Sequence, residues 1–205
     1  MDKKSRLTQL RYDRISSVYE WMDKPMDWFV EDGWRRKILS NARGKTLEVG
    51  VGTGKNLRFY PENVDITGID FSSKMLEKAL RKKYALDLDA DLLLMDVQDM
   101  LFEDNLFDFV FTTFVFCSVP DPIKGIQEIL RVLKPGGKLM MLEHVRSDRW
   151  LMGKIMDALN PITVRMIGAN INRETVENVK LSIGRKPLTR NVRGDIVKLI
   201  TVIKK

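Results

Sequence analysis

Five short apolar runs alternate along the chain with segments in which apolar residues recur every three to four positions. Each run is apolar on both faces, and the spacing between runs leaves room for a helical crossover, a pattern typical of a parallel sheet covered on both sides. The runs are Lys45–Val49, Asp65–Asp70, Ala90–Met95, Phe107–Thr113 and Lys138–Glu143. The helical spacing occupies Lys55–Tyr60, Ser73–Lys83 and Pro122–Leu133.

Polar and turn-forming residues mark the ends of these elements. Ser72 precedes the segment SKMLEKALRKK as a helix N-cap, and basic residues gather in the last turn of that segment, as the helix dipole favours. The segment KPGG, from Lys134 to Gly137, ends the third helix with a proline and leads into the fifth strand.

The pattern changes near the C-terminus, where two apolar runs lie close together. Leu188–Val192 and Ile196–Ile203 flank the tripeptide RGD, from Arg193 to Asp195, which predicts a hairpin rather than another crossover. The chain is therefore expected to adopt an α/β fold with a doubly wound, seven-stranded sheet. That sheet is mostly parallel with an antiparallel C-terminal hairpin, and it carries helices on both faces.

Composition places these elements in a single soluble domain. The chain has 205 residues, of which 44% are hydrophobic and 31% are charged, values typical of globular proteins. No apolar run approaches the ~18–20 residues of a membrane-spanning helix, and the N-terminal segment MDKKSRLTQLRYDR has no apolar core like that of a signal peptide. We therefore expect a cytoplasmic protein.

The counts of cysteine, histidine and charged residues narrow the chemistry. The single cysteine, Cys117, excludes an internal disulfide, and the single histidine, His144, argues against a histidine-based metal site, so no metal is predicted. The formal net charge of +7 suits an anionic membrane surface or simply a solubilising surface. Nucleic acid is not an expected partner, because the chain has no dense tract of lysine and arginine.

The segment TLEVGVGTG joins the first predicted strand to a glycine-rich turn. A strand that ends in such a turn and opens a helix presents free N–H groups and the positive end of a dipole to a ligand. The spacing is Gly50, Gly52 and Gly54, and Lys55 stands where a dinucleotide fingerprint has its third glycine, which argues against a nicotinamide or flavin cofactor. Glu48 before the loop suits a ligand with an ammonium group.

Two carboxylates lie at the ends of the next two strands, in register with this loop. Asp70 lies 20 residues after Gly50, where an acidic residue can accept hydrogen bonds from both hydroxyls of a ribose. The alternative for Asp70 is an ordinary helix cap. Asp96 ends the third strand, where its carboxylate could accept a hydrogen bond from an adenine amino group.

Four segments, in this order, resemble the successive motifs of class I S-adenosylmethionine-dependent methyltransferases: LEVGVGTG, GIDFSSKMLEKA, FDFVFTTFVFCSVPDP and EILRVLKPGGKLMMLEHV. The resemblance is continuous from about Thr46 to Val145. It implies a Rossmann-like sheet, the cofactor S-adenosyl-L-methionine and the product S-adenosyl-L-homocysteine.

The same resemblance implies a role for each motif residue. Glu48, Gly50, Gly52 and Gly54 would border the methionine part of the cofactor. Asp70 would hold the ribose, Phe71 and Met75 would flank the adenine, Asp96 and Val97 would meet the adenine edge, and Thr113 would face the methionine moiety and the sulfonium.

The N-terminal segment YDRISSVYEWMD is similar to that of ubiquinone/menaquinone-pathway methyltransferases and bacterial phospholipid N-methyltransferases, in which a tyrosine closes over the cofactor. That role would fall to Tyr12 and Tyr19. CSVPDP, LEHVRS and GANINRETVENV resemble phosphatidylethanolamine methyltransferase-like proteins and animal membrane-associated thiol methyltransferases. Two departures limit this resemblance: the sequence is shorter than most quinone-pathway enzymes, and we expect no long apolar N-terminal anchor like that of the animal thiol enzymes.

The acceptor side offers few candidate catalytic residues. Cys117 and Ser118 follow the fourth strand, where related enzymes approach the methyl group, and His144 ends the fifth strand at the carboxyl edge of the sheet. The alternative to a catalytic role for Cys117 is that of a small buried apolar residue, and the alternative for His144 is that of a hydrogen-bonded structural histidine. Glu143 could orient His144 or position an acceptor amine.

These observations divide one methyltransferase domain, residues 1–205, into four parts: an N-terminal helical lid at 1–43, a cofactor-binding core at 44–147, a lid or substrate insertion with a helix at 148–183, and the hairpin at 184–205. Tryptophans concentrate in the first and third parts, and they suit either packing or a membrane interface. They are Trp21, Trp28, Trp34 and Trp150.

The expected acceptor is small and lipophilic, with the amine of a phospholipid head group as the first choice. A thiol and a quinone ring carbon are the alternatives, and a cofactor-binding protein without turnover is the rival from another class. The basic, tryptophan-rich N-terminal segment would place a phospholipid methyltransferase at the inner face of an anionic membrane, as a monomer or a dimer.

Overall fold

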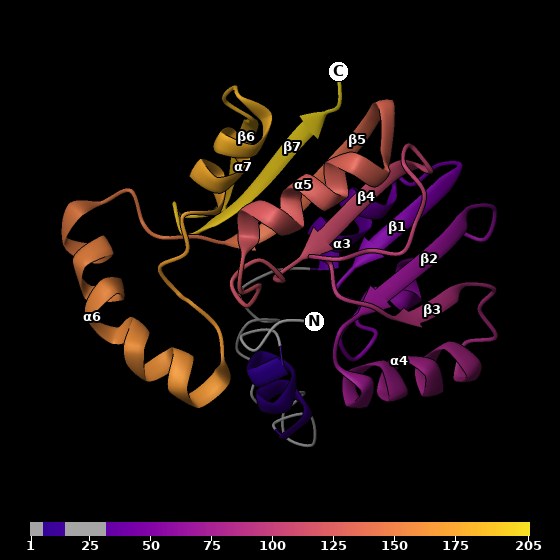
Figure 1. Cartoon of the computed structure of the whole chain (residues 1–205), viewed down its shortest axis with the longest axis horizontal. Coiled ribbons are helices and arrows are strands. Elements are labelled where there is room, and N and C mark those ends of the chain that lie inside the picture. The colour runs from indigo at the N-terminus through magenta and orange to yellow at the C-terminus, as the bar shows by residue number, and fades with distance from the viewer. Residues whose placement is uncertain (1–5, 15–31) are drawn as a thin grey trace.

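The computed structural model describes residues 6–14 and 32–205. Within these ranges, seven strands form one sheet in the order β3-β2-β1-β4-β5-β7-β6 (Figure 1). Neighbours from β3 through β5 are parallel, whereas β7 runs antiparallel to both β5 and β6. The strands are β1 (Lys45–Val49), β2 (Asp65–Asp70), β3 (Asp91–Leu94), β4 (Phe107–Thr113), β5 (Leu133–His144), β6 (Leu188–Arg193) and β7 (Val197–Ile203). The predicted mixed sheet is confirmed.

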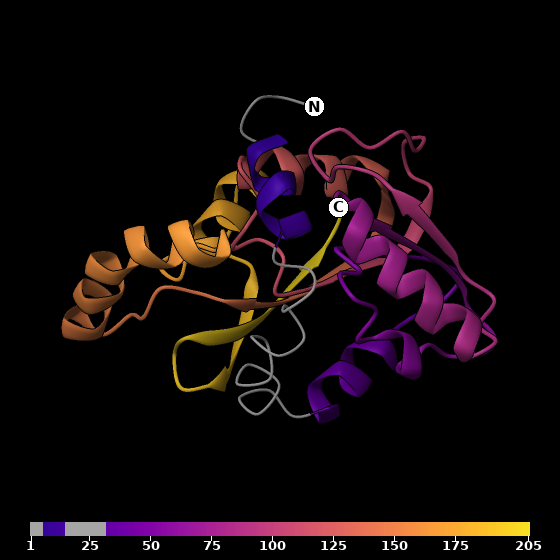
Figure 2. The ribbon, with the colours of Figure 1, turned by 90° about the horizontal axis from the view of Figure 1, so that it is seen from below.

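Helices cover both faces of this sheet. The labelled helices are α3 (Asp32–Leu39), the 3-10 turn η1 (Leu57–Phe59), α4 (Ser73–Ala85), α5 (Pro122–Val132), α6 (Trp150–Ile167) and α7 (Thr175–Ile183). A further helix at residues 6–14 precedes them. In both views α6 projects beyond the end of the sheet, and its C-terminal end lies near the helix at 6–14 (Figures 1 and 2).

Side chains of the central strand β4 contribute to both layers of the core. Phe107 and Val110 pack with Ile126 and Ile129 of α5 on one face, together with residues of α7. Phe109 and Phe111 pack on the other face with residues of α3. Because β4 is buried on both sides, it has the continuous apolar sequence from which a central parallel strand is predicted.

The helix N-termini follow the signals in the sequence. The Ser72 hydroxyl accepts a hydrogen bond of 3.2 Å from the Met75 N–H and so caps α4, as predicted. In α5, the Asp121 carboxylate accepts a bond of 3.0 Å from the Lys124 N–H, and Pro122 occupies the first turn, where the N–H that proline lacks would have no helical partner.

Two predicted elements differ from the structure in kind or extent, and the other boundaries agree to within one or two residues. The predicted helix over Lys55–Tyr60 is reduced to the single turn η1. The segment KPGG lies inside β5, where pairing with β4 shifts from Phe107↔Leu133 to Phe109↔Lys138. Gly136 has a φ of +76° at this irregularity, a conformation that glycine adopts without strain. The proline thus interrupts the beginning of a strand as well as ending a helix.

The topology creates a crevice at one edge of the sheet. The strand order reverses between β1 and β4, so the connections that leave these two parallel neighbours cross opposite faces of the sheet. Ligands of open α/β sheets bind where such connections diverge, at the carboxyl ends of the strands. The residues that follow β1, β2, β3 and β4 are therefore brought together here.

Candidate cofactor pocket

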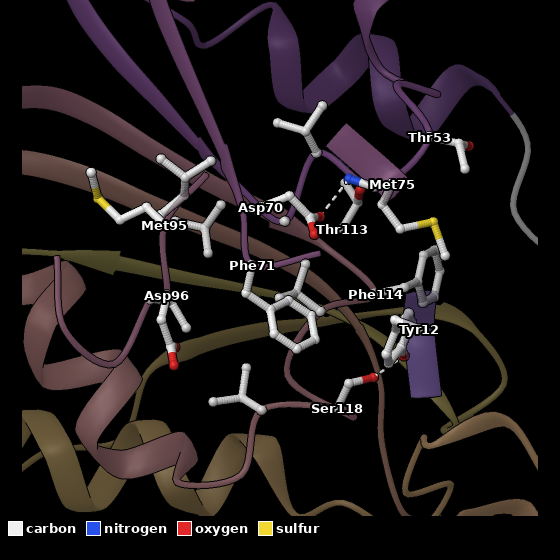
Figure 3. A pocket seen from close by; sticks show the side chains of 18 of the residues that line it. Tyr12, Thr53, Asp70, Phe71, Met75, Met95, Asp96, Thr113, Phe114 and Ser118 are labelled. Atoms are coloured by element: carbon white, nitrogen blue, oxygen red, sulfur yellow. Dashed lines mark hydrogen bonds between the residues drawn. The ribbon is translucent and has the colours of Figure 1, made fainter. Parts of the chain in front are cut away.

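A pocket lies at this crevice and receives residues from the carboxyl ends of four parallel strands. Gly50 and Gly52 follow β1, Asp70 ends β2 and Phe71 follows it, Asp96 follows β3, and Thr113 ends β4. Figure 3 shows the side chains of Phe71, Asp96 and Ser118 pointing toward the same space. The structure therefore gathers residues that are separated by more than 60 positions in the sequence.

The three glycines of the loop have different physical reasons to be glycine. All have positive φ, but a Cβ on Gly50 would lie 2.4 Å from Val115, and a Cβ on Gly54 would lie 2.6 Å from Leu57. Gly54 is not among the residues that line the pocket. A Cβ on Gly52, at a φ of +58°, would meet no protein atom within 4 Å, and Gly52 does line the pocket. Gly52 is thus the position where bare backbone faces the ligand space.

Asp70 holds the glycine loop against the start of α4. One carboxylate oxygen accepts a hydrogen bond of 2.8 Å from the Gly52 N–H, and the other accepts one of 2.8 Å from the Ser72 N–H. Burial raises the pKa of Asp70 to about 6, although both N–H groups favour the ionised form. The carboxylate lies on the pocket wall and combines structural contacts with acceptor capacity toward a ligand.

The far end of the pocket combines an apolar wall with a carboxylate. Phe71, Met75 and Val97 line it together with Asp96. The Asp96 carboxylate accepts a hydrogen bond of 2.9 Å from the Gln98 N–H, which fixes its orientation after β3. A planar aromatic base can therefore stack on the apolar wall and donate a hydrogen bond from its amino group to the Asp96 carboxylate.

The helix at residues 6–14 closes one side of the pocket. The Tyr12 hydroxyl forms a hydrogen bond with the Ser118 hydroxyl (Figure 3), and the Tyr12 ring packs edge-on against Phe71 with a centroid distance of 5.7 Å. Gln9 donates a bond of 2.8 Å to the Phe71 carbonyl, and the Ser72 hydroxyl donates one of 2.6 Å to Asp13. Tyr19, Trp21 and Trp28 lie outside the described residues.

Glu48 lies behind the glycine loop, outside the set of residues that line the pocket. It is 1% exposed, and its carboxylate accepts hydrogen bonds from the Asn56 amide, at 2.7 Å, and from the Tyr60 hydroxyl. Burial raises the pKa of Glu48 to about 7. A ligand's ammonium group would therefore meet Glu48 through Asn56, which does line the pocket.

Arg35, which sequence reasoning missed, reaches the same region from α3. It is 5% exposed and lines the pocket. Its guanidinium donates hydrogen bonds to the side-chain oxygens of Asn56, at 2.7 Å, and of Thr113, at 3.3 Å. A buried guanidinium at this end of the pocket offers a partner for a carboxylate. The available signal was an arginine three residues before the buried Ile38, on the inward side of a short helix.

The buried carboxyl of Glu48 predicts a pH-dependent stability. Its folded-state pKa lies above the usual value of 4.5, so its contribution to stability is complete below pH 4.5 and is lost as the pH rises through 7. In urea unfolding, Glu48→Gln should match the wild type near pH 5 and exceed it by about 2 kcal/mol near pH 7.5. The exposed Glu62→Gln is the control, and a Glu48→Gln difference that does not change with pH would contradict this assignment.

The three candidate catalytic residues are placed differently. Ser118 lines the pocket, whereas Cys117 and His144 are not among the lining residues. The Cys117 thiol donates a bond of 3.5 Å to the Phe114 carbonyl, and burial raises its pKa to about 12, so the thiol is protonated at neutral pH. Burial lowers the pKa of His144, and its buried Nδ1 has no hydrogen-bond partner among the described residues.

The Glu143 carboxylate forms its hydrogen bonds with the end of β4 and the loop that follows it, rather than orienting His144. Its carboxylate accepts hydrogen bonds from the Thr112 hydroxyl, at 2.6 Å, and from the backbone N–H groups of Val115, at 3.3 Å, and Phe116, at 3.1 Å. Burial raises the pKa of Glu143 to about 7. These contacts fix the segment that leads to Ser118.

The residues present fit the cofactor that the motifs imply. Gly52 leaves backbone open to the ligand, and Asp70 offers a carboxylate for ribose hydroxyls. Phe71 and Asp96 offer a face and an edge partner for adenine, and Arg35 offers a cation for a carboxylate. Across residues 6–14 and 32–205, no group of three or more histidine, cysteine, aspartate or glutamate side chains is arranged to hold a metal ion.

Comparison with known proteins identifies the family of the chain. The methyltransferase domain family matches residues 47–141. The chain is 34% identical over 170 residues to a phosphatidylethanolamine N-methyltransferase of Cereibacter sphaeroides, covering 76% of this chain and 84% of that protein. It is 33% identical to a ubiquinone/menaquinone biosynthesis C-methyltransferase of Geotalea daltonii, covering 70% and 65%. It is 32% identical to a thiol S-methyltransferase of Rattus norvegicus, covering 65% and 57%.

A solved structure supports the fold. A methyltransferase of Thermotoga maritima, described as a possible histamine N-methyltransferase, superposes with a TM-score of 0.68 at 21% identity, covering 95% of this chain and 99% of that one. No helix in the described part of the chain is long and apolar enough to cross a membrane.

Proposed function

The chain belongs to the class I S-adenosylmethionine-dependent methyltransferases, and we propose that its acceptor is the amine of a phospholipid head group, of the phosphatidylethanolamine type. The observation that carries this choice is the chemistry of the pocket wall. None of the described residues that line it is a histidine or a cysteine. A neutral amine needs little help from a base, whereas a ring carbon needs a proton removed.

The cofactor supplies a methyl group on a sulfonium, and this transfer depends mainly on in-line alignment and exclusion of water. In the proposal, Gly52 and Asp70 hold the sugar and the adjoining chain, and Phe71, Met75, Asp96 and Val97 hold the adenine. Arg35 and Asn56 bind the amino-acid end, supported from behind by Glu48. The Tyr12 ring, fixed by Phe71 and Ser118, excludes water from the same space.

On the acceptor side, Ser118 is the residue that we assign to the substrate. Its hydroxyl lines the pocket and can accept a hydrogen bond from an incoming amine when it is released from Tyr12. Cys117 remains a neutral, packed thiol in this scheme, because burial raises its pKa to about 12. His144 is a structural residue hydrogen-bonded to the backbone of Ile171.

The similarity to named enzymes supports the amine over the other acceptors. It spans 84% of the phosphatidylethanolamine N-methyltransferase, against 57% of the thiol S-methyltransferase. A thiol acceptor remains the second candidate function, since a thiolate likewise needs no strong base. The quinone ring carbon is third. A lipid acceptor also implies peripheral contact with an anionic membrane.

Transfer of label tests this assignment. The protein is incubated with methyl-labelled S-adenosylmethionine and a panel of phosphatidylethanolamine, alkyl thiols and demethylated quinones, after calorimetry has shown that S-adenosylhomocysteine binds. Label in phosphatidylethanolamine is the expected result. Label only in thiols or quinones would replace the proposed acceptor. Binding without label in any acceptor of the panel would favour a protein that binds the cofactor without turnover.

A further inference from the structure

α6 buries Met156 but exposes most of its other large apolar side chains, whereas a helix packed on a protein core buries them. Six of its apolar side chains, here called the α6 stripe, are between 45% and 64% exposed. At roughly 100° per residue, the six fall within an arc of about 100° along one side of the helix. They are Leu151, Met152, Ile155, Leu159, Ile162 and Met166.

The opposite side of α6 is fixed to the protein by polar contacts. Arg146 donates two hydrogen bonds to the Asp157 carboxylate, of 3.0 and 2.9 Å. The Asn160 side-chain oxygen accepts a bond of 3.0 Å from the Ile171 N–H, and its amide donates one of 3.3 Å to Asn170. Because these contacts hold the polar side inward, the α6 stripe faces outward.

The charges around the stripe select among possible partners. Lys154 and Arg165 are exposed beside it, and Arg149 is exposed immediately before the helix. The one acidic residue of α6, Asp157, is paired with Arg146 on the inward side. Trp150, at the start of the helix, is 74% exposed. Apolar side chains flanked by cations and an interfacial tryptophan are complementary to anionic head groups above an acyl layer.

The C-terminal end of α6 lies next to the side of the cofactor pocket that the helix at residues 6–14 closes. At the end of α6, a Cβ on Gly168 would lie 3.5 Å from the Tyr12 ring. The Asn170 N–H, two residues later, donates a bond of 2.8 Å to the Cys117 carbonyl, beside Ser118. Leu7 and Leu10 of the helix at residues 6–14 are 52% and 58% exposed. Exposed apolar side chains are therefore present both on α6 and on the helix at residues 6–14, which lies near the C-terminal end of α6 (Figure 2).

From these observations we infer that α6 is a membrane-docking helix, which lies in the plane of an anionic bilayer with the α6 stripe among the acyl chains. A charged, proline-containing helix of 18 residues suits this interfacial position. The inference rests on the proposed function in one respect: docking through α6 brings the Tyr12 and Ser118 side of the pocket to the surface where a phospholipid amine is found.

Flotation with vesicles tests the docking. The stripe variant Ile155→Ser/Leu159→Ser is compared with Leu101→Ser/Leu181→Ser, which removes two leucines that are 85% and 61% exposed elsewhere. Neither pair changes the net charge. On phosphatidylcholine vesicles that contain phosphatidylglycerol, the stripe variant should partition at least about tenfold more weakly than wild type, whereas the control should match wild type. S-adenosylhomocysteine affinity should be unchanged in both variants, which shows that they fold.

Two outcomes would overturn the inference. Flotation of the stripe variant equal to that of wild type would show that α6 does not carry membrane contact. A wild-type dimer that does not float, and that the stripe variant converts to a monomer in sedimentation experiments, would assign the stripe to a second copy of the chain.

Activity measurements separate this inference from the acceptor assignment. On phosphatidylethanolamine in anionic vesicles, the stripe variant should lose roughly tenfold in rate, in parallel with its partitioning, but on a short-chain, water-soluble phosphatidylethanolamine it should equal wild type. Wild type that floats through the stripe but methylates neither lipid would refute the acceptor and leave the docking standing. Equal rates on vesicles for the stripe variant and wild type would refute the docking and leave the acceptor standing.

Discussion

Replacement of Gly52 by valine should give a folded protein with no measurable affinity for S-adenosylhomocysteine in calorimetry. Gly52 lines the pocket, and at its φ of +58° an added Cβ would enter space that no protein atom occupies within 4 Å. The valine side chain would fill the position that the ligand needs. The left-handed conformation also costs a residue with a Cβ about 1–2 kcal/mol, which lowers stability without abolishing the fold.

A matched variant separates occlusion from backbone strain. Gly194 lies in the turn between β6 and β7 with a φ of +54°, and an added Cβ there would also meet nothing within 4 Å. Gly194→Val should therefore lose a similar amount of stability in thermal unfolding and retain full affinity. If Gly52→Val bound the ligand as well as Gly194→Val does, the backbone of Gly52 would not be in contact with the cofactor.

Asp70→Ala should weaken S-adenosylhomocysteine binding by about 3 kcal/mol, or more than a hundredfold. This estimate takes ~1.5 kcal/mol for each of two ribose hydroxyls that lose a charged acceptor. The same substitution removes the acceptor of the Gly52 N–H, at 2.8 Å, so the loop itself is also less well held. Calorimetry measures the affinity, and thermal unfolding shows whether the variant remains folded.

Asp108→Ala is the control for this substitution. Asp108 also accepts a backbone hydrogen bond, of 2.9 Å from the Lys45 N–H, and it forms an ion pair of 2.8 Å with Lys134. It is not among the residues that line the pocket. Its removal should leave the affinity unchanged. An Asp70→Ala affinity equal to that of wild type would show that Asp70 is a structural cap without a ligand contact.

The pKa of Asp70 adds a pH signature to the same experiment. Its value of about 6 means that the acceptor is ionised above pH 6 and protonated below it. The ionised carboxylate accepts hydrogen bonds from both ribose hydroxyls. The affinity of the wild type for S-adenosylhomocysteine should therefore rise as the pH is raised from about 5 to 7.5, and Asp70→Ala should lose this dependence. Glu48 has a pKa of about 7, so the comparison is repeated in the Glu48→Gln background.

Most strands were predictable because the sequence shows both an apolar run and the polar or turn-forming residues that bound it. β1, β2 and β4 have the predicted bounds, since each apolar run begins or ends at polar or turn-forming residues. β5 begins five residues earlier than predicted, at Leu133. A proline and two glycines normally indicate a break, but the pairing of Leu133 with Phe107 depends on a neighbouring strand that local sequence does not show.

The pocket was predictable only where residues follow strand ends. Asp70 and Asp96 lie together because β2 and β3 are parallel neighbours, so motif position determines spatial position. Arg35 belongs to a helix outside the motifs, and burial of its guanidinium becomes visible only once α3 packs beside Asn56. Cys117 follows β4 and His144 ends β5, but neither is in the pocket lining, because the direction of a side chain at a strand end depends on the backbone that follows.

The position of β7 has a consequence for biosynthesis. β7 follows β6 in the sequence but lies between β5 and β6 in the sheet. While the chain is being translated, the hydrogen-bonding edge of β5 therefore has no neighbour until residues 197–203 have emerged from the ribosome. Insertion of β7 is a long-range event that joins elements made much earlier with one made late. Until then the nascent chain exposes an apolar strand edge, and it depends on rapid insertion, or on a chaperone that covers this edge, to avoid aggregation.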